Sequence, residues 1–216
     1  MSNKLRTVIV NYQTPDLLKI AADSFRKFYP SSPLLIIDNG SKDNSRELIE
    51  DFRRLAPEYT NVLLLESNTY HGPAMHKAMS EVKEDLILFL DSDTKTINKG
   101  FIEAMQAEFE KSSNVYGVGR IITVNKRGFP SDKGIGVLST AYMMLRRNMY
   151  FSLPPFEHHG QPSLKNFIAA QKKEYVLKSF PIENYIEHHW RGTASRYGYG
   201  LGLKGKMDFV LNKIGL

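Results

Sequence analysis

The chain of 216 residues carries 29 lysine and arginine residues against 23 acidic ones, a formal net charge of +6 and a pI near 9.3. It has no cysteine, which excludes disulfides, thiolate metal sites and cysteine nucleophiles, and its 42% of hydrophobic residues suffices for an ordinary core. No stretch approaches the roughly 18 apolar residues of a membrane-spanning helix, and the polar first residues lack a signal peptide's apolar segment, so we expect a cytoplasmic protein, soluble or peripheral.

The first half of the chain alternates apolar runs of strand length with helical patterns. The apolar runs are residues 7–10, 34–37, 62–65 and 86–90. Helical spacing of apolar residues follows each run, from Pro15, after Ser41, over about 73–82 and over about 99–110. Four strand–loop–helix units with wholly apolar strands predict a parallel sheet that is covered by helices on both faces.

After residue 110 the pattern changes. Strands are expected at 115–124, 142–145 and 175–180, followed by an extended segment at 185–191, with a loop at 125–136 and a helix at 164–172. No linker divides the chain, so we expect one domain with two halves, 1–110 and 111–197, and a glycine-rich tail, 198–216. Five lysine and arginine residues stand against one aspartate from residue 191 onward, so the positive charge is concentrated there.

The segment Asp91-Ser92-Asp93 directly follows the fourth apolar run. Side chains two residues apart on an extended backbone point to the same side, so the two carboxylates can converge. Two hard oxygen ligands at a sheet edge suit Mg²⁺ or Mn²⁺, which keeps coordination positions open for phosphate oxygens. An isolated Asp-x-Asp more often caps a turn, and it is the position after a buried strand that favours a metal site here.

An Asp-x-Asp segment after an apolar strand is also typical of haloacid-dehalogenase-type phosphatases. Those enzymes have threonine or valine two residues past the second aspartate and carry the motif on the first strand of the fold. Here Lys95 occupies that position and the motif follows the fourth apolar run. We therefore do not favour a phosphatase.

Two further polar segments fall at the same predicted edge, where α/β sheets bind ligands. Asp38 ends the second run, and a carboxylate there can accept a hydrogen bond from a nucleobase N–H, while Gly40 permits a tight turn. Residues 68–73 precede a helix whose N-terminus favours an anion, and Gly72 lets backbone approach a ligand closely. Each segment alone also fits an ordinary turn with a helix cap.

Taken in order, four segments resemble family 2 glycosyltransferases, in particular the rhamnosyltransferase-like branch. These are residues 8–12 (VIVNY), 37–45 (IDNGSKDNS), 68–78 (NTYHGPAMHKA) and 90–94 (LDSDT). The resemblance covers about residues 5–110 and continues more weakly to about 195. It implies an α/β fold of the GT-A type, Rossmann-like, with a mostly parallel sheet flanked by helices. It also implies an inverting, metal-dependent hexosyltransferase that moves a sugar from a nucleotide diphosphate to a hydroxyl acceptor.

The same resemblance implies that residues 1–110 bind the donor and residues 111–197 bind the acceptor. The donor contacts that it implies are Asn11, Tyr12, Asp38, Asn68, Gly72, Asp91, Ser92 and Arg191. Asn11 and Tyr12 would line the base pocket, and Asp38 would contact a uracil or thymine ring, which favours a UDP- or dTDP-sugar. Arg191 and Arg196 would bind the diphosphate, although both also fit a solvated basic surface.

The metal ligands that the resemblance implies come from both halves of the chain. Asp93 would coordinate Mn²⁺ or Mg²⁺ directly, and Asp91 would contact the ribose and the water shell of the ion. His188 is followed four and five residues later by Gly192 and Thr193, as in family members, and would be the third protein ligand as a neutral imidazole.

The general base departs from the family pattern. Inverting members usually have an aspartate within a Glu-Asp pair before the late helix, where this chain has Gln161-Pro162-Ser163. The reaction needs a group that removes the proton of the acceptor hydroxyl. Glu157 and His159 are the candidates, and the sequence does not decide between them.

The acceptor is expected to be a glycan or a lipid-linked glycan, with modified nucleic acid as an alternative. The basic tail supports a second class of function, a non-catalytic protein that binds a polyanion or a membrane surface. Both interpretations can hold together, because a basic tail can keep an enzyme at the anionic inner face of a membrane.

Overall fold

The structure is a computed structural model that describes residues 4–190 and 192–197. Its strands are β1 (Leu5–Asn11), β2 (Leu34–Asp38), β3 (Thr60–Leu64), β4 (Leu86–Asp91), β5 (Thr94–Thr96), β6 (Val115–Val124), β7 (Ile135–Arg146), β8 (Val176–Ser179) and β9 (Ile186–His188). Its helices are α1 (Pro15–Phe28), α2 (Ser45–Leu55), α3 (His71–Glu81), α4 (Phe101–Glu110), α5 (Arg147–Tyr150), α6 (Leu164–Lys172) and α7 (Thr193–Tyr197), with a 3₁₀ turn, η1 (Ile182–Asn184).

Seven strands form a central sheet in the order β3-β2-β1-β4-β7-β6-β8. The neighbours β3, β2, β1 and β4 are parallel, and β7 alone runs antiparallel to the strands on either side of it. The predicted mostly parallel sheet is therefore confirmed. In the register of the sheet, Asn11 lies beside Asp38 and Val10 lies beside Asp91, so these polar residues meet at one edge.

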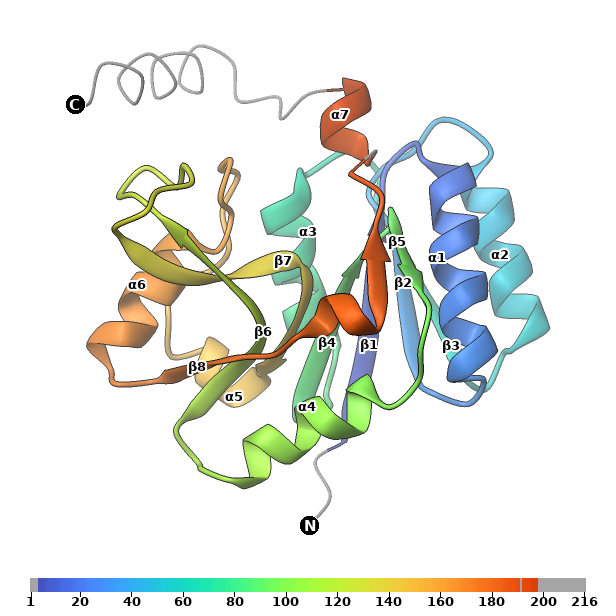
Figure 1. Cartoon of the computed structure of the whole chain (residues 1–216). Coiled ribbons are helices and arrows are strands. Elements are labelled where there is room, and N and C mark those ends of the chain that lie inside the picture. The colour runs from blue at the N-terminus through green and yellow to red at the C-terminus, as the bar shows by residue number, and fades with distance from the viewer. Residues whose placement is uncertain (1–3, 191, 198–216) are drawn as a thin grey trace.

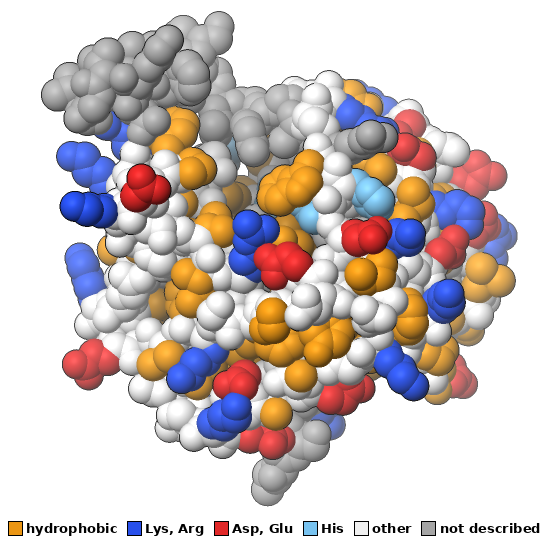
Figure 2. Space-filling view, in the orientation of Figure 1, with side chains coloured by type: hydrophobic (Ala, Val, Ile, Leu, Met, Phe, Trp, Pro, Cys, Tyr) orange, Lys and Arg blue, Asp and Glu red, His pale blue; other side chains and the backbone are white. Residues whose placement is uncertain are grey.

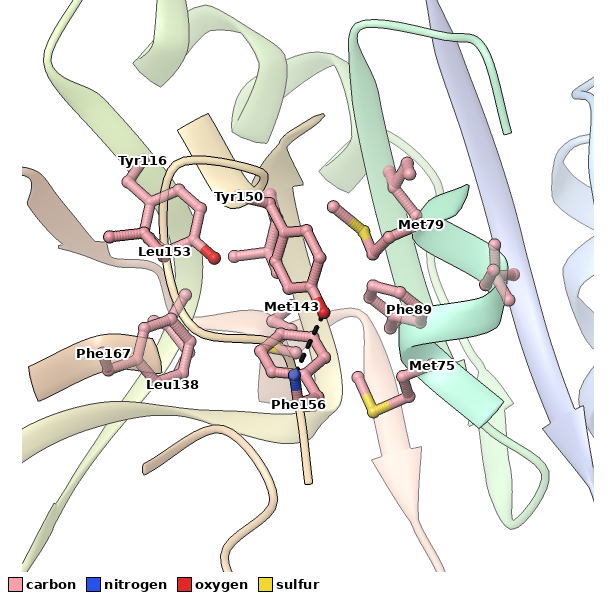
Figure 3. Packing of buried hydrophobic residues seen from close by; sticks show 14 of the residues in the cluster. Met75, Met79, Phe89, Tyr116, Leu138, Met143, Tyr150, Leu153, Phe156 and Phe167 are labelled. Carbon is pink, nitrogen blue, oxygen red and sulfur yellow. Dashed lines mark hydrogen bonds between the residues drawn. The ribbon is translucent and has the colours of Figure 1, made fainter. Parts of the chain in front are cut away.

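Helices cover both faces of the sheet because residues of the apolar strands alternate between the two faces (Figure 1). Ile9 packs with α1, α2 and α4, whereas its neighbours Val8 and Val10 pack with α3, α5 and α6 on the other face. On that second face, Met75 and Met79 of α3 lie against Phe89 of β4 (Figure 3). This packing fixes α3 relative to the strand that ends at Asp91.

The start of α3 differs from the prediction. The helix begins at His71, two residues before the expected start at Pro73. Proline is tolerated in a first helical turn because the N–H groups of that turn have no partner within the helix. The earlier start brings His71 into the helix at the carboxyl edge of the sheet.

The second half contains one strand pair that the sequence did not predict. Residues 94–96, directly after the Asp-x-Asp segment, form β5, which pairs antiparallel with β9 and places Thr94 opposite His188. The expected strand at 142–145 is longer and begins at Ile135. The expected strand at 115–124 and helix at 164–172 are confirmed with the predicted bounds.

Candidate functional site

The carboxyl ends of β1 and β4 are joined by a buried network of hydroxyl and amide groups. Asn11 is fully buried, and its side-chain oxygen accepts a 2.9 Å hydrogen bond from the hydroxyl of Thr14. The Thr14 hydroxyl lies 3.2 Å from the hydroxyl of Ser92, and the Asn11 amide lies 3.5 Å from the hydroxyl of Ser41. Two predicted donor contacts, Asn11 and Ser92, are thus parts of one network that fixes the loops of this edge.

One carboxylate oxygen of Asp38 accepts hydrogen bonds within the protein, and the other accepts none from the described residues. Its Oδ2 accepts hydrogen bonds of 3.0 Å from the backbone N–H of Ser41 and from Nε of Arg46. Its Oδ1 is buried and has no hydrogen-bond partner among the described residues. A buried carboxylate oxygen without a partner costs free energy, so this atom is a natural acceptor for a ligand N–H.

The segment 67–70 is held against the turn after β2. Asn68 accepts hydrogen bonds from the Asn39 amide at 3.1 Å and from the backbone N–H of Tyr70 at 2.7 Å. Gly40 has a φ of +80°, and a Cβ there would lie 2.4 Å from the carbonyl carbon of Ser67. Glycine is therefore required at this turn both for its backbone conformation and for the close approach of the next loop.

The structure brings Asp91, Asp93 and His188 together. One ligand atom from each residue lies within 4.8 Å of the others, although the histidine is 95 residues beyond the second aspartate. His188 Nε2 lies 3.0 Å from Asp93 Oδ1 and 3.9 Å from Asp91 Oδ2. The β5–β9 ribbon creates this proximity, and the Gly192 N–H donates a 2.8 Å hydrogen bond to Asp93 Oδ2.

These three side chains fit a divalent cation. Ligands about 2.1 Å from an octahedral ion lie between about 3.0 Å apart when adjacent and about 4.2 Å apart when opposite, and the separations of His188 Nε2 from the two carboxylates, 3.0 and 3.9 Å, lie within that range. His188 has only 8% of its side chain exposed, and neither of its ring nitrogens makes a hydrogen bond to a described residue. A buried imidazole with two unused nitrogens beside two carboxylates is explained if a cation binds there.

The surroundings of the cluster disfavour the charged form of Asp91. Burial raises the pKa of the Asp91 carboxyl above its ordinary value, and the charge of Asp93 adds to that increase, while His71 and His188 act to lower it. Crowded carboxylates favour a bound cation, because the cation removes the repulsion between them.

Rings on two sides hold the imidazole of His188. The Trp190 ring packs edge-on at 4.0 Å between ring centroids, and the buried Tyr142 ring lies at 5.9 Å. Trp190 itself has a φ of +55° and 66% of its surface exposed. Two other non-glycine residues with positive φ, Gln13 and Tyr70, also lie in loops of this edge, and such strain is concentrated at functional sites.

His71 was not among the predicted site residues, yet it reaches the cluster. Its Nε2 lies 3.4 Å from Asp91 Oδ1.

The space beside Gly72 is filled by the protein itself, since a Cβ there would lie 2.0 Å from the carbonyl oxygen of Glu157. The glycine is therefore required by a contact between two segments of this chain, whereas the sequence had suggested the approach of a ligand.

The two candidate bases lie in the loop before α6. Glu157 forms an ion pair of 2.9 Å with Lys165, and its backbone carbonyl covers the first turn of α3. His159 accepts a 2.9 Å hydrogen bond at Nδ1 from the backbone N–H of Gln161 and lies near Gly128. Of the two, Glu157 is in the segment that contacts the helix carrying His71.

Two arginines, Arg191 and Arg196, were predicted to bind the diphosphate. Arg191 and the tail 198–216 lie outside the described residues. Arg196 binds both carboxylate oxygens of Asp16 on α1, at 2.9 and 2.7 Å, so its charge is engaged by the protein. The ring of Tyr12, a predicted base contact, packs edge-on against Tyr197 of α7 at 6.0 Å.

Arg46 and His71 contact predicted site residues but were not themselves predicted to belong to the site. Arg46 contacts Asp38 across 8 residues, and no local pattern marked it. Gly192, which the sequence pattern placed four residues after His188, contacts Asp93 across 99 residues, a contact that no local pattern indicated. His71 had a signal, its position beside Gly72 at a helix start, but that position gave no indication of a contact with Asp91.

Among the described residues, no helix combines the length and the apolarity needed to cross a lipid bilayer.

The chain matches the family model of "Glycosyl transferase family 2" over residues 7–170. An undecaprenyl-phosphate 4-deoxy-4-formamido-L-arabinose transferase of Proteus mirabilis is 25% identical over 122 residues, 55% of this chain and 37% of its own length. An uncharacterized glycosyltransferase of Nostoc sp. is 28% identical over 190 residues, 83% of this chain and 54% of its own length. The chain thus spans about half or less of the length of these relatives.

Several solved structures share the fold. A Pyrobaculum calidifontis mannosyltransferase in complex with GDP-Man and Mn²⁺ has a TM-score of 0.69 at 11% identity, over 84% of this chain and 55% of that one. GalNAc-T7 with UDP, GalNAc and Mn²⁺ has a TM-score of 0.65 at 15% identity, over 86% and 43%. S. aureus TarS residues 1–349 with UDP-GlcNAc has a TM-score of 0.62 at 17% identity, over 85% and 57%.

Proposed function

The chain belongs to glycosyltransferase family 2 and has the GT-A fold, and from this premise we propose that it is an inverting, metal-dependent glycosyltransferase. It would move a sugar from a nucleotide diphosphate, UDP or dTDP, to a hydroxyl group. Residues 1–110 would bind the donor and residues 111–197 the acceptor.

The observation that carries this proposal is the convergence of Asp91, Asp93 and His188 at the carboxyl edge of the sheet. These residues would hold Mn²⁺ or Mg²⁺. The imidazole ligand favours Mn²⁺, because Mg²⁺ prefers oxygen ligands throughout. When bound, the cation would neutralise the charge that develops on the leaving nucleotide diphosphate.

The remaining residues of the edge would bind and orient the donor. Asp38 would accept a hydrogen bond from the nucleobase N–H at Oδ1, while Arg46 and Ser41 keep its other oxygen engaged. Asn11 and Ser92 would keep the loops after β1 and β4 in place, and Tyr12 would line the base pocket beside Tyr197.

The proton of the acceptor hydroxyl must be removed as the sugar carbon is attacked. We assign this role to Glu157 in preference to His159, because the backbone of Glu157 packs on the first turn of α3, next to the cluster. Glu157→Gln should lower turnover about 10²-fold or more with donor affinity retained. His159→Ala is the comparison, and a greater loss of turnover in that variant would transfer the role to His159.

The name of a relative bears on the class of acceptor. One relative is named as an undecaprenyl-phosphate transferase, which supports an acceptor carried on a lipid, here a lipid-linked glycan that offers a hydroxyl group. The C-terminal segment from residue 191 onward, which includes the tail and has a net charge of +4, would assist by holding the enzyme at an anionic membrane face.

A thermal-shift panel of nucleotide diphosphates and their sugars, with and without Mn²⁺, tests the donor and the metal together. We expect UDP or dTDP to raise the melting temperature only when Mn²⁺ is present, because ion and diphosphate bind as a unit. Equal shifts with and without Mn²⁺, or no shift with any nucleotide, would overturn the proposal.

The non-catalytic alternative, polyanion or membrane-surface binding, gains no comparable support from the described residues. On the face drawn in Figure 2, lysine and arginine side chains alternate with acidic ones except along the left edge, where several basic side chains lie near one another. Removal of the tail separates the two functions, since transfer to a soluble acceptor should persist while binding to anionic vesicles falls.

A further inference from the structure

His71 lies at the edge of the site without a role in the proposed reaction. Its Nε2 is buried, makes no hydrogen bond to any described residue, and lies 3.4 Å from Asp91 Oδ1. A buried ring nitrogen without a partner is costly, so its position calls for an explanation.

The two oxygens of Asp91 face different histidines. Oδ1 lies toward His71, and Oδ2 lies toward His188, 3.9 Å from its Nε2. The group of possible metal ligands includes Asp91, Asp93 and His188 but not His71. His71 therefore lies beside the Asp91 oxygen that is not the one nearest His188, where a partner of a metal-binding carboxylate is expected.

The tertiary structure holds His71 in this place from two directions. Met75 and Met79 pack α3 against β4, the strand that ends in Asp91 (Figure 3). From the other side, Glu157 O closes on Gly72 and leaves no room for a side chain there.

The loop that carries Glu157 is itself tied to the core, because the backbone N–H of Phe156 donates a 3.0 Å hydrogen bond to the Tyr150 hydroxyl (Figure 3). The residue before His71, Tyr70, has a φ of +66°, and its ring stacks on His158 at 3.5 Å between centroids. A strained backbone that packing holds in place is typical of a residue that must be aimed.

We propose that His71 is a positioning residue for the metal site: its Nε2–H donates to Asp91 Oδ1 and so orients Oδ2 toward the cation. The inference rests on the proposed metal-dependent function. A hydrogen bond of ordinary length would shorten the present 3.4 Å separation by about half an ångström. With Oδ1 engaged, Asp91 presents a single oxygen to the ion, which keeps further coordination positions for the donor phosphates.

The test measures Mn²⁺ affinity of the full chain by electron paramagnetic resonance of free Mn²⁺, without any nucleotide. His71→Phe keeps a planar aromatic ring at this position and removes the donor, so its dissociation constant for Mn²⁺ should rise about 10- to 100-fold. His71→Gln, whose amide can donate from a similar position, should stay within about threefold of the wild type. Wild-type affinity in His71→Phe would overturn the proposal.

A double-mutant cycle separates positioning from general damage to α3. In an Asp91→Asn background, His71→Ala should cause no further loss of Mn²⁺ affinity, because its effect passes through the Asp91 carboxylate. A further loss of about tenfold would show that His71 acts by another route. His76→Gln, on the same helix and bonded to Tyr150 rather than to the cluster, is the matched control and should bind Mn²⁺ like the wild type.

Asp93→Asn distinguishes failure of this inference from failure of the proposed function. If Asp93→Asn binds Mn²⁺ as the wild type does, the metal site is wrong and the role of His71 falls with it. If Asp93→Asn loses Mn²⁺ while His71→Phe retains it, the metal site stands and only the role of His71 is refuted.

Discussion

The two edges of the central sheet treat polar groups in opposite ways. At the amino edge, Arg6 donates hydrogen bonds to Glu84 and Asn61, and Arg146 donates to the carbonyls of Val115 and Phe109 at 3.1 and 3.0 Å. At the carboxyl edge, buried polar atoms remain without hydrogen-bond partners. Five of the seven such side-chain atoms among the described residues belong there, to Asp38, His71, His188 and His189.

This difference shows which edge of the sheet stabilises the folded state and which edge destabilises it. Unpartnered buried groups destabilise the folded state, and a protein tolerates them where a ligand will satisfy them. The amino edge contains salt bridges and capped carbonyls that hold the strands together. The carboxyl edge holds crowded carboxylates and imidazoles whose partners are expected to come from outside the chain.

The largest effect is expected from Asp93→Asn, which removes a charge from the carboxyl edge without changing its shape. Transfer activity should fall about 10³-fold, because a metal ligand that supports several kcal/mol of transition-state stabilisation is lost. The free energy of unfolding in EDTA should not decrease, since repulsion with Asp91 is relieved. Steady-state kinetics and urea denaturation measure the two quantities. Asp23→Asn, an exposed carboxylate on α1 paired with Lys19, is the control, and activity retained in Asp93→Asn would contradict the site.

The second prediction is the converse change at the amino edge. Arg146→Met should lower the free energy of unfolding by about 2–3 kcal/mol, because the carbonyls of Val115 and Phe109 lose a charged donor. Turnover measured well below the melting temperature should be unchanged. Arg53→Met, which removes an exposed pair with Glu50, should leave denaturation curves where they are. A loss of turnover in Arg146→Met without a loss of stability would break the comparison.

The third prediction concerns the contact that joins the two halves of the site. In Gly72→Ala the new methyl group would lie 2.0 Å from Glu157 O, so the first turn of α3 or the loop must move. We expect about 2 kcal/mol of destabilisation together with a loss of activity, measured by denaturation and by transfer assays. Gly136→Ala, where the nearest atom is 3.4 Å away, should be tolerated. Equal behaviour of the two variants would refute the contact.

The smallest effect is a dependence of stability on pH at the amino edge. Burial acts to raise the pKa of the Glu84 carboxyl, but hydrogen bonds from Arg6 and from the backbone outweigh it and lower that pKa below its ordinary value. Stabilisation by this pair is therefore complete above the unfolded-state pKa and is lost as the pH falls through the lowered value. Arg6→Met should cost about 1 kcal/mol at pH 7 and less near pH 3, measured by denaturation at both pH values. An equal cost at both would exclude this ion pair as the cause.

Much of the fold could be predicted because its signals are local. Apolar runs of four or five residues followed by helical spacing gave the parallel strands, and Pro15 gave the start of α1. The position of Asp91 and Asp93 directly after such a run was enough to put both at the carboxyl edge, because all parallel strands end on the same side.

The surroundings of those aspartates could not be predicted in the same way. The segment 94–96 is too short and too polar to be predicted as a strand, yet its pairing with β9 places His188 beside Asp93. The resemblance supplied His188 as a candidate, but no spacing in the sequence could indicate the 3.0 Å approach.

By itself, the sequence determined the alternation of strands and helices and the convergence of two carboxylates, because backbone geometry repeats over two or four residues and leaves a readable pattern. Only the tertiary structure decided what surrounds them: His188 on one side of Asp91, His71 on the other, and Glu157 against Gly72. Those contacts join segments far apart in the chain through core packing and strand pairing. Many different sequences allow the same packing and pairing, so these contacts leave no local pattern in the sequence.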